Sequence, residues 1–313
     1  MAFREYGRHG ALRCAVVFGG VGQQPQVRAL QRGTDVLVAT PGRLLDLITQ
    51  GFVDLGLVET FVLDEADRML DMGFMPDVRR VIARLPSRRQ TLLFSATMPD
   101  AIARLAGTIL HNPVQVRMAP VKAATELIEQ SVVFVSRQGK LRTLADFLTA
   151  GAVSRALVFT RTKRGADRVA KQLNQAGIRA DAMHGNKSQS ARQQSLARFK
   201  SSRTRVLVAT DIAARGIDVE GISHVVNYDM PEEPETYVHR IGRTGRAGAS
   251  GCAVSFCDAE EQKHLRAIER LIRQTLPVAQ GVSAVRVAAV ESRNRPPSGT
   301  PRARARAKRS LVR

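Results

Sequence analysis

Three carboxylates lie within four residues, directly after an apolar stretch that ends at Leu63: Asp64, Glu65 and Asp67. If that stretch is a strand of a parallel sheet, its carboxyl end is the edge at which α/β proteins bind ligands. A carboxylate there can hold magnesium through water, and a second one can orient or deprotonate a water that attacks a γ-phosphate. The alternative is an acidic first turn of a helix, which the helix dipole favours by itself.

Two further groups of residues suit the same chemistry. Ser95 and Thr97 follow another apolar stretch, where their hydroxyls could link the acidic group to the rest of a site, although such residues more often cap a helix. His239, Arg240, Arg243 and Arg246 lie within eight residues much later in the chain. Arginine neutralises charge on a phosphoryl group in transfer, and an arginine supplied across a cleft acts as an arginine finger. The alternative for this last group is a basic surface patch.

The elements that must position these residues are strands and helices in alternation. Short β-branched stretches alternate with segments of helical periodicity, which predicts βα units around parallel sheets. The predicted strands are 14–18, 35–39, 59–63, 91–94 and 114–117, then 131–135, 156–160, 206–209, 224–227 and 253–256, and the predicted helices include 138–149, 164–175 and 189–199. Several strands are apolar at successive positions, as expected of strands buried on both faces. The fold class is therefore α/β.

The length of 313 residues allows two ordinary domains, each with its own core, and one domain with a long disordered region is the weaker alternative. Residues 119–125 contain Pro120 and small residues without a clear period, which predicts a linker. The predicted first domain is 1–118, the second is 126–276, and the tail is 277–313. After Glu291 the chain has eight Arg and Lys residues and no acidic ones, which predicts a disordered basic arm that tethers RNA.

Composition narrows the classes of partner and location. Lys and Arg outnumber Asp and Glu by 48 to 28, and the net charge of +20 favours a polyanionic partner without distinguishing RNA, DNA and acidic membranes. The absence of Trp and the presence of only three Tyr favour contacts to phosphates over base stacking. We find no membrane span and no secretory leader, so the sequence predicts a cytoplasmic protein. The three cysteines form no CxxC pair, which predicts neither a disulfide framework nor a zinc site.

The motifs, in this order and spacing, resemble those of the DEAD-box RNA helicases of superfamily 2, and within them the small bacterial branch. Residues 64–67 match the motif that names the family, 95–97 its SAT motif, and 239–246 its sixth motif. The resemblance implies two tandem RecA-like domains that close together on RNA and ATP and locally unwind RNA duplexes. The catalytic residues it implies are Asp64, Glu65, Ser95, Thr97, His239, Arg243 and Arg246, with Asp64 and Glu65 also holding magnesium.

The same resemblance implies contacts to nucleotide and RNA. The nucleotide would be held by Asp64, Glu65, Gly216, Asp218, Arg243 and Arg246. The RNA backbone would be held by Gly19, Gly20, Thr40, Gly42, Arg43, Gln189, Arg192 and Thr210. Because phosphate contacts carry no base information, we expect little sequence preference. Ribosomal or RNA-decay partners are compatible with the resemblance.

The sequence departs from the family at the phosphate-binding loop. It contains no GxxxxGK[ST], and the superficial candidate, Gly139 with Lys140, is discounted because it begins a helix of the second half. The glutamine element that reads adenine and the PTREL-like RNA element are also missing. We therefore expect an incomplete first domain with an exposed apolar face, and either a true start upstream of Met1 or a remnant of a longer gene. The alternative functions are a non-catalytic RNA-binding remnant and a DNA-acting motor of the same superfamily.

Overall fold

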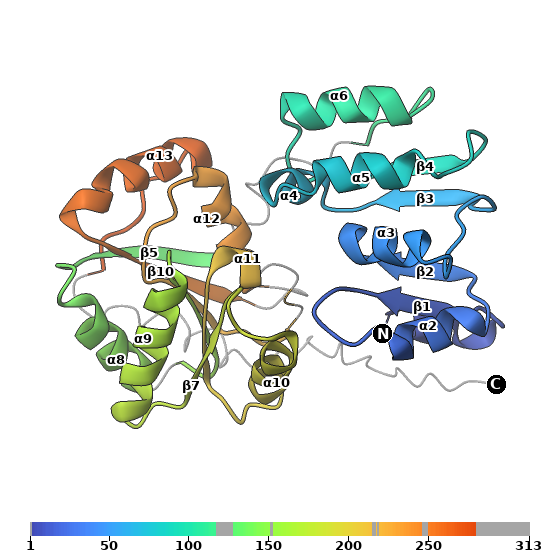
Figure 1. The fold of residues 1–313 in the computed structure, drawn as a ribbon. Helices are drawn as coiled ribbons and strands as arrows, with labels where there is room; N and C mark the ends of the chain where they lie inside the picture. Colours follow the sequence, from blue (N-terminus) through green and yellow to red (C-terminus); the bar gives the residue numbers. More distant parts are fainter. Residues whose placement is uncertain are drawn as a thin grey trace, which may run out of the picture. The chain divides into compact units, whose positions relative to one another are not determined.

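The computed structural model describes residues 2–116, 128–150, 153–214, 217, 219–245 and 250–279. By its internal contacts the chain divides into two compact units, each with its own core (Figure 1). The first unit comprises Met1–Pro120, Met183–Ala197 and Ile212–Arg215, and the second comprises Val121–Ala182, Arg198–Asp211 and Gly216–Arg313. The predicted linker at 119–125 lies outside the described residues, so the position of that boundary stays a prediction.

The first unit alternates short strands with helices, as the sequence predicts. Its elements are α1 (Ala2–Tyr6), η1 (Gly7–His9), β1 (Cys14–Val17), α2 (Gln24–Gln31), β2 (Val36–Ala39), α3 (Pro41–Thr49), β3 (Thr60–Leu63), α4 (Ala66–Asp71), α5 (Met75–Ile82), β4 (Gln90–Leu93) and α6 (Asp100–Ile109). Strands β1 and β2 form one parallel pair and β3 and β4 form another. The strand predicted at 114–117 is not found at 114–116, where Val114 and Val116 are highly exposed and no described strand pairs with them; residue 117 lies outside the described part.

The two strand pairs of the first unit are packed on one face only. Val17 packs with Val27 and Leu47 in one core cluster, and Leu63 belongs to a second one. On the other face, Val16, Val38 and Val62 are 52%, 39% and 50% exposed. The prediction that apolar strands are buried on both faces is therefore wrong for these strands, because the described residues provide no second layer.

The second unit contains a six-stranded sheet in the order β5-β10-β9-β6-β8-β7. The elements from residue 128 onward are β5 (Ile128–Phe134), α8 (Lys140–Thr149), β6 (Ala156–Phe159), α9 (Lys163–Gln175), β7 (Ala180–Met183), α10 (Gln189–Lys200), β8 (Val206–Ala209), α11 (Asp211–Ala214), β9 (His224–Asn227), α12 (Pro234–Ile241), β10 (Gly251–Cys257), η2 (Ala259–Glu261) and α13 (Gln262–Ile272). By internal contacts most of α10 and of α11 is grouped with the first unit. Helices α8 and α9 cover one face and α12 and α13 the other (Figure 1), and every residue of β6, β8, β9 and β10 is buried. This confirms an α/β fold with a parallel sheet.

Two features of this unit differ from the sequence prediction. Strand β7 is absent from the predicted strands because it is a four-residue stretch that includes Asp181 and only its two end residues are buried. The chain after Leu276 also continues into the fold, since Val132 donates to the Pro277 carbonyl at 2.9 Å and accepts from the Ala279 N–H at 2.9 Å. The predicted tail therefore begins at least three residues too early, and its remainder from 280 lies outside the described residues. None of the described helices is long and apolar enough to cross a membrane.

Buried His224 in β9 should make the stability of the protein depend on pH. Its ring packs edge-on against Phe147, its Nδ1 lies 2.8 Å from the Ser223 hydroxyl, and burial lowers its pKa from 6.5 to about 4. The unfolded chain therefore takes up a proton before the folded chain does. We expect the free energy of unfolding to fall by roughly 3 kcal/mol as the pH drops from 6.5 to 4.

Urea denaturation at a series of pH values measures this loss. The variant His224→Asn should lose that part of the pH dependence, whereas His264→Asn, at a partly exposed position of α13, should keep it. Equal pH dependence in the wild type and His224→Asn would show that another group is responsible.

Candidate functional site

A hydrogen-bond network joins the acidic segment after β3 to the Ser-Ala-Thr segment after β4. The N–H and the hydroxyl of Thr97 each donate to Asp67 Oδ2 at 2.8 Å. The Ser95 hydroxyl accepts from the Asp67 N–H at 3.1 Å and donates to the Thr97 carbonyl at 2.6 Å. Since Leu63 pairs with Leu93 in the parallel register, the two segments leave the sheet side by side. The hydroxyls of Ser95 and Thr97 therefore bond to the acidic segment itself, while the predicted link from that segment to the rest of a site stays a prediction.

Asp67 is the centre of this network, and its carboxylate is held in the charged form. Burial is the largest influence and by itself would raise the pKa of Asp67, but the hydrogen bonds from Thr97, the Arg68 N–H and Ser95 together lower it below 3.8. Ser95 and Thr97 do not cap the helix that follows them, because the residue before α6 is Pro99. They fix the first turn of α4 instead. This positioning role of Asp67 was not predicted from the sequence, although the residue lies in the same motif as Asp64 and Glu65.

Asp64 and Glu65 are both exposed at the carboxyl end of β3. Glu65 has φ 52° and ψ 48°, a left-handed conformation that costs a residue with a side chain about 1 kcal/mol or more. Its N–H donates to Asp64 Oδ1 at 2.9 Å, and its carboxylate pairs with the Arg68 guanidinium. The strained turn holds both carboxylates at the open edge of the sheet, where solutes can reach them.

The glycine pair after β1 lies in a loop that a buried glutamine holds from behind. Gln26 accepts from the Phe18 N–H at 2.9 Å and donates to the carbonyls of Phe18 and Gly22 at 3.1 and 3.3 Å. Gly19 and Gly20 are exposed, and Gly20 has φ 78°, which favours glycine. The loop therefore presents bare backbone to solvent, as a phosphate contact requires.

Arg43 supports the same loop. Its Nη2 donates to the Val21 carbonyl at 3.2 Å, and only 14% of its side chain is exposed. The other two predicted RNA contacts of its segment are exposed: Thr40 directly precedes α3 and Gly42 lies in its first turn. The structure thus places Arg43 behind the loop and Thr40 and Gly42 at the surface.

In the second unit, Arg240 joins the ends of three strands. Its guanidinium donates twice to Asp211, at 2.6 and 2.8 Å, and also to Asn227 Oδ1 and the Asp229 carbonyl. It lies over the ring of Phe159, 5.0 Å from the centroid. This structural role of Arg240 was not predicted from the sequence. The signal was available, because Arg240 shares a helix face with buried apolar residues of α12.

The remaining described residues that the sequence predicted from the second half of the chain make local contacts, within α10 and at the end of α12. Arg243 donates to the Ile217 and His239 carbonyls at 3.2 and 3.3 Å. Thr210 is buried directly after β8, and Arg192 donates to Gln189 Oε1 at 3.1 Å in the first turn of α10. Three predicted site residues lie outside the described residues: Gly216, Asp218 and Arg246.

An ionic cluster around the buried side chains of Lys140 and Glu261 lies at the carboxyl edge of the six-stranded sheet, and it also contains Arg161, Asp229 and Asp258, which are partly or largely exposed. Lys140 Nζ lies 2.5 Å from Glu261 Oε2, 3.3 Å from Asp258 Oδ2 and 3.7 Å from Asp229 Oδ1. Arg161 donates to Glu261 Oε1 at 2.9 Å. Lys140 is 1% exposed and begins α8, so it is not available to a phosphate, in agreement with the discounting of Gly139 and Lys140 as a phosphate-binding loop.

The exposed carboxylates suit magnesium only in a shared site. Among the described residues, no group of three or more His, Cys, Asp or Glu side chains can hold a metal ion. Mg²⁺ in nucleotide sites keeps several waters and is bound by one or two carboxylates together with phosphates. Asp64 and Glu65 therefore fit as the protein's share of such a site.

Two protein families match the chain. The DEAD/DEAH box helicase family matches residues 1–105, and the helicase conserved C-terminal domain matches residues 139–248.

Comparisons with individual proteins also find RNA helicases. The ATP-dependent RNA helicase CshA of Listeria monocytogenes is 43% identical over 276 residues, which cover 88% of this chain and 53% of that protein. The ATP-dependent RNA helicase DBP2 of Eremothecium gossypii is 46% identical over 281 residues, with 87% and 50% covered. The chain spans about half the length of the curated relatives it matches. The structure of S. cerevisiae Dbp5 bound to RNA and ADP BeF3 is 30% identical, with a TM-score of 0.79, and the match covers 88% of this chain and 72% of that one.

Proposed function

The chain belongs to the DEAD/DEAH box helicase family, and on that premise we propose that it binds RNA and uses ATP hydrolysis to open RNA duplexes locally. The observation that carries the proposal is the network of Asp67, Ser95 and Thr97, which ties the acidic segment to its neighbour at the carboxyl edge of the first unit's strands. The relative Dbp5, whose structure contains RNA and a nucleotide, supports both ligands.

The roles we propose for the nucleotide site follow from exposure and charge. Asp64 and Glu65 would hold Mg²⁺ jointly with the phosphates, and the ion would neutralise charge on them. Glu65 would orient and deprotonate the attacking water. Asp67, Ser95 and Thr97 are positioning residues that fix the turn carrying both carboxylates. Arg243 and Arg246 would stabilise charge on the transferring group, with His239 beside them; Gly216 and Asp218 would contact the nucleotide.

For RNA, we propose contacts to the backbone alone. The exposed residues Gly19, Gly20, Thr40 and Gly42 would bind phosphates from the first half of the chain. Gln189, Arg192 and Thr210 would bind them from the second half. Such contacts give little sequence preference. Arg43 receives a different role, because its guanidinium supports the Gly19–Gly20 loop from behind.

Replacement of Arg43 tests this role. Arg43→Met removes the hydrogen bond to the Val21 carbonyl, so we expect RNA affinity to fall by about threefold to tenfold, as for the loss of one hydrogen bond. Because a positioning residue neutralises no phosphate, the slope of log K against log salt concentration should stay unchanged. A direct phosphate contact would instead lower that slope by about 0.7. Fluorescence anisotropy with a single-stranded RNA at several salt concentrations distinguishes the two, and Arg28→Met, at an exposed position of α2, is the matched control.

A second candidate function is RNA binding without ATP turnover. The observation that favours it is the lack of GxxxxGK[ST] in the 313 residues. RNA-stimulated ATP hydrolysis by the purified chain decides between the two. Turnover that rises with RNA supports the helicase, whereas RNA binding without turnover supports the binding protein. Stimulation by DNA as strong as that by RNA would contradict RNA specificity.

A further inference from the structure

Four cationic side chains lie along one face of α13: Lys263, Arg266, Arg270 and Arg273. Their spacings of three, four and three residues place them in one row, which extends about 15 Å along the axis. All four are exposed, while the apolar face of the helix, with Leu265, Ile268 and Ile272, is buried. We call these four residues the α13 basic row.

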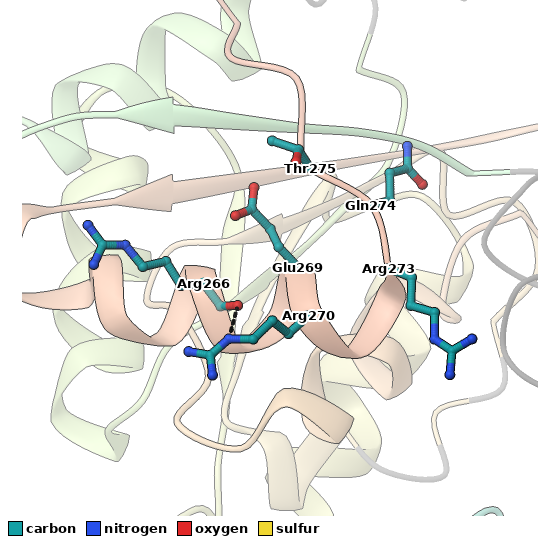
Figure 2. A pocket seen from close by; sticks show the side chains of 6 residues that line it. All are labelled: Arg266, Glu269, Arg270, Arg273, Gln274 and Thr275. Carbon is teal, nitrogen blue, oxygen red and sulfur yellow. Dashed lines mark hydrogen bonds between the residues drawn. The ribbon is translucent and has the colours of Figure 1, made fainter.

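The row borders an open hollow of about 450 Å³ at the carboxyl end of the helix (Figure 2). The hollow is lined by Arg266, Glu269, Arg270, Arg273, Gln274 and Thr275. The Gln274 amide and the Thr275 hydroxyl add neutral hydrogen-bonding groups beside the three guanidinium groups. No aromatic side chain lines the hollow, so it offers charge and hydrogen bonds but no surface for base stacking.

The charges of the row are not neutralised within the described fold. None of the four residues forms an ion pair with a described residue, and within the row Arg270 Nε donates to the Arg266 carbonyl at 3.2 Å. The carboxylate of Glu269 accepts from the Leu276 N–H at 2.9 Å and so stabilises the turn that follows α13. The helix dipole favours cations in the last turn but opposes Lys263 in the first, so it does not account for the row.

The hollow lies apart from the motif residues of the same unit. Helix α13 follows β10, and after it Val278 pairs in parallel with Val132 of β5. A connection between two parallel strands must run back against them, so the carboxyl end of α13 lies away from the sheet edge that carries Thr210. Arg266, Arg270 and Arg273 therefore cannot share one phosphate contact with the motif residues.

We propose that the α13 basic row binds the phosphate backbone of RNA that extends beyond the motif contacts. The proposal rests on the proposed RNA-binding function and adds a second contact surface to it. Guanidinium groups bind phosphate oxygens in pairs, and Gln274 and Thr275 can bond to phosphate or to 2′-hydroxyls. The sequence after Glu291 has eight cations and no acidic residue, so it also favours a polyanionic partner.

The test compares long and short RNA on the full chain. The triple variant Arg266→Gln/Arg270→Gln/Arg273→Gln is compared with a control that removes three exposed cations elsewhere on the second unit, Arg142→Gln/Lys171→Gln/Lys200→Gln. Affinities are measured by anisotropy with single-stranded RNAs of about 8 and about 40 nucleotides. We expect the triple variant to bind the long RNA about tenfold more weakly, with the salt slope lowered by about 2, because each lost phosphate contact removes about 0.7. The short RNA should bind unchanged, and thermal melting should show an intact fold.

Two outcomes overturn the inference. One is that the triple variant binds the long RNA with the same affinity and salt slope as the control variant. The row would then face an acidic protein or only solvent. The other is equal weakening on short and long RNA, which would merge the row with the motif contacts. If the wild-type chain binds neither RNA, the proposed function is contradicted, and so is the proposal for the α13 basic row that rests on it.

Discussion

Glu65→Gln should lower RNA-stimulated ATP turnover by about 100-fold or more while RNA affinity stays within about twofold, because only the general base is removed. Glutamine keeps the size of the side chain and an oxygen that can accept from Arg68, so the left-handed turn at Glu65 can persist. It cannot take a proton from water. Steady-state ATP hydrolysis at saturating RNA measures the turnover, and fluorescence anisotropy on the same samples measures the RNA affinity.

The matched control for this prediction is Glu59→Gln, an exposed carboxylate just before the other end of β3. It removes the same charge and should leave turnover unchanged. Turnover retained by Glu65→Gln would remove Glu65 from its role as base. A wild-type chain that binds RNA without any turnover would instead favour the non-catalytic function.

Lys140→Met should lower the free energy of unfolding by about 3–5 kcal/mol, the cost of removing one partner from a buried ion pair. The variant leaves the carboxylate of Glu261, which is 4% exposed, and those of Asp258 and Asp229 without their central cation. Methionine fills nearly the same volume as lysine, so the substitution leaves little empty space and the loss of packing contributes little to the change in stability. Urea unfolding of the full chain, monitored by circular dichroism, measures the loss.

Two further variants make the cause of this loss testable. Lys171→Met changes an exposed lysine of α9 in the same way and should cost little. The double variant Lys140→Met/Glu261→Gln should lose less free energy of unfolding than the two single variants lose together. In each single variant one charged side chain remains without its partner, whereas in the double variant both charges are removed. Additive losses would show that the two side chains contribute independently, and would contradict the account of the cluster as one electrostatic unit.

The α/β class, most of the strands and the family could be predicted from the amino-acid sequence. Apolar β-branched stretches such as 206–209 form strands wherever a parallel sheet buries them, so local pattern was sufficient. The motifs were also local: Asp64 and Glu65 stand directly after a strand, and a strand's carboxyl end fixes where they are displayed. Pattern failed where burial was partial, as in β7, and where β-branched residues had no partner strand, as at Val114 and Val116.

Which polar groups contact one another became visible only in the folded structure. Spacing along the chain does not reveal that Thr97 binds Asp67 across thirty residues, or that Arg240 binds Asp211. It also could not show that Arg43 faces the Val21 carbonyl while neighbouring Gly42 faces solvent. The physical reason is that buried charged and polar groups must find partners, and those partners come from whichever strand ends the sheet order brings together.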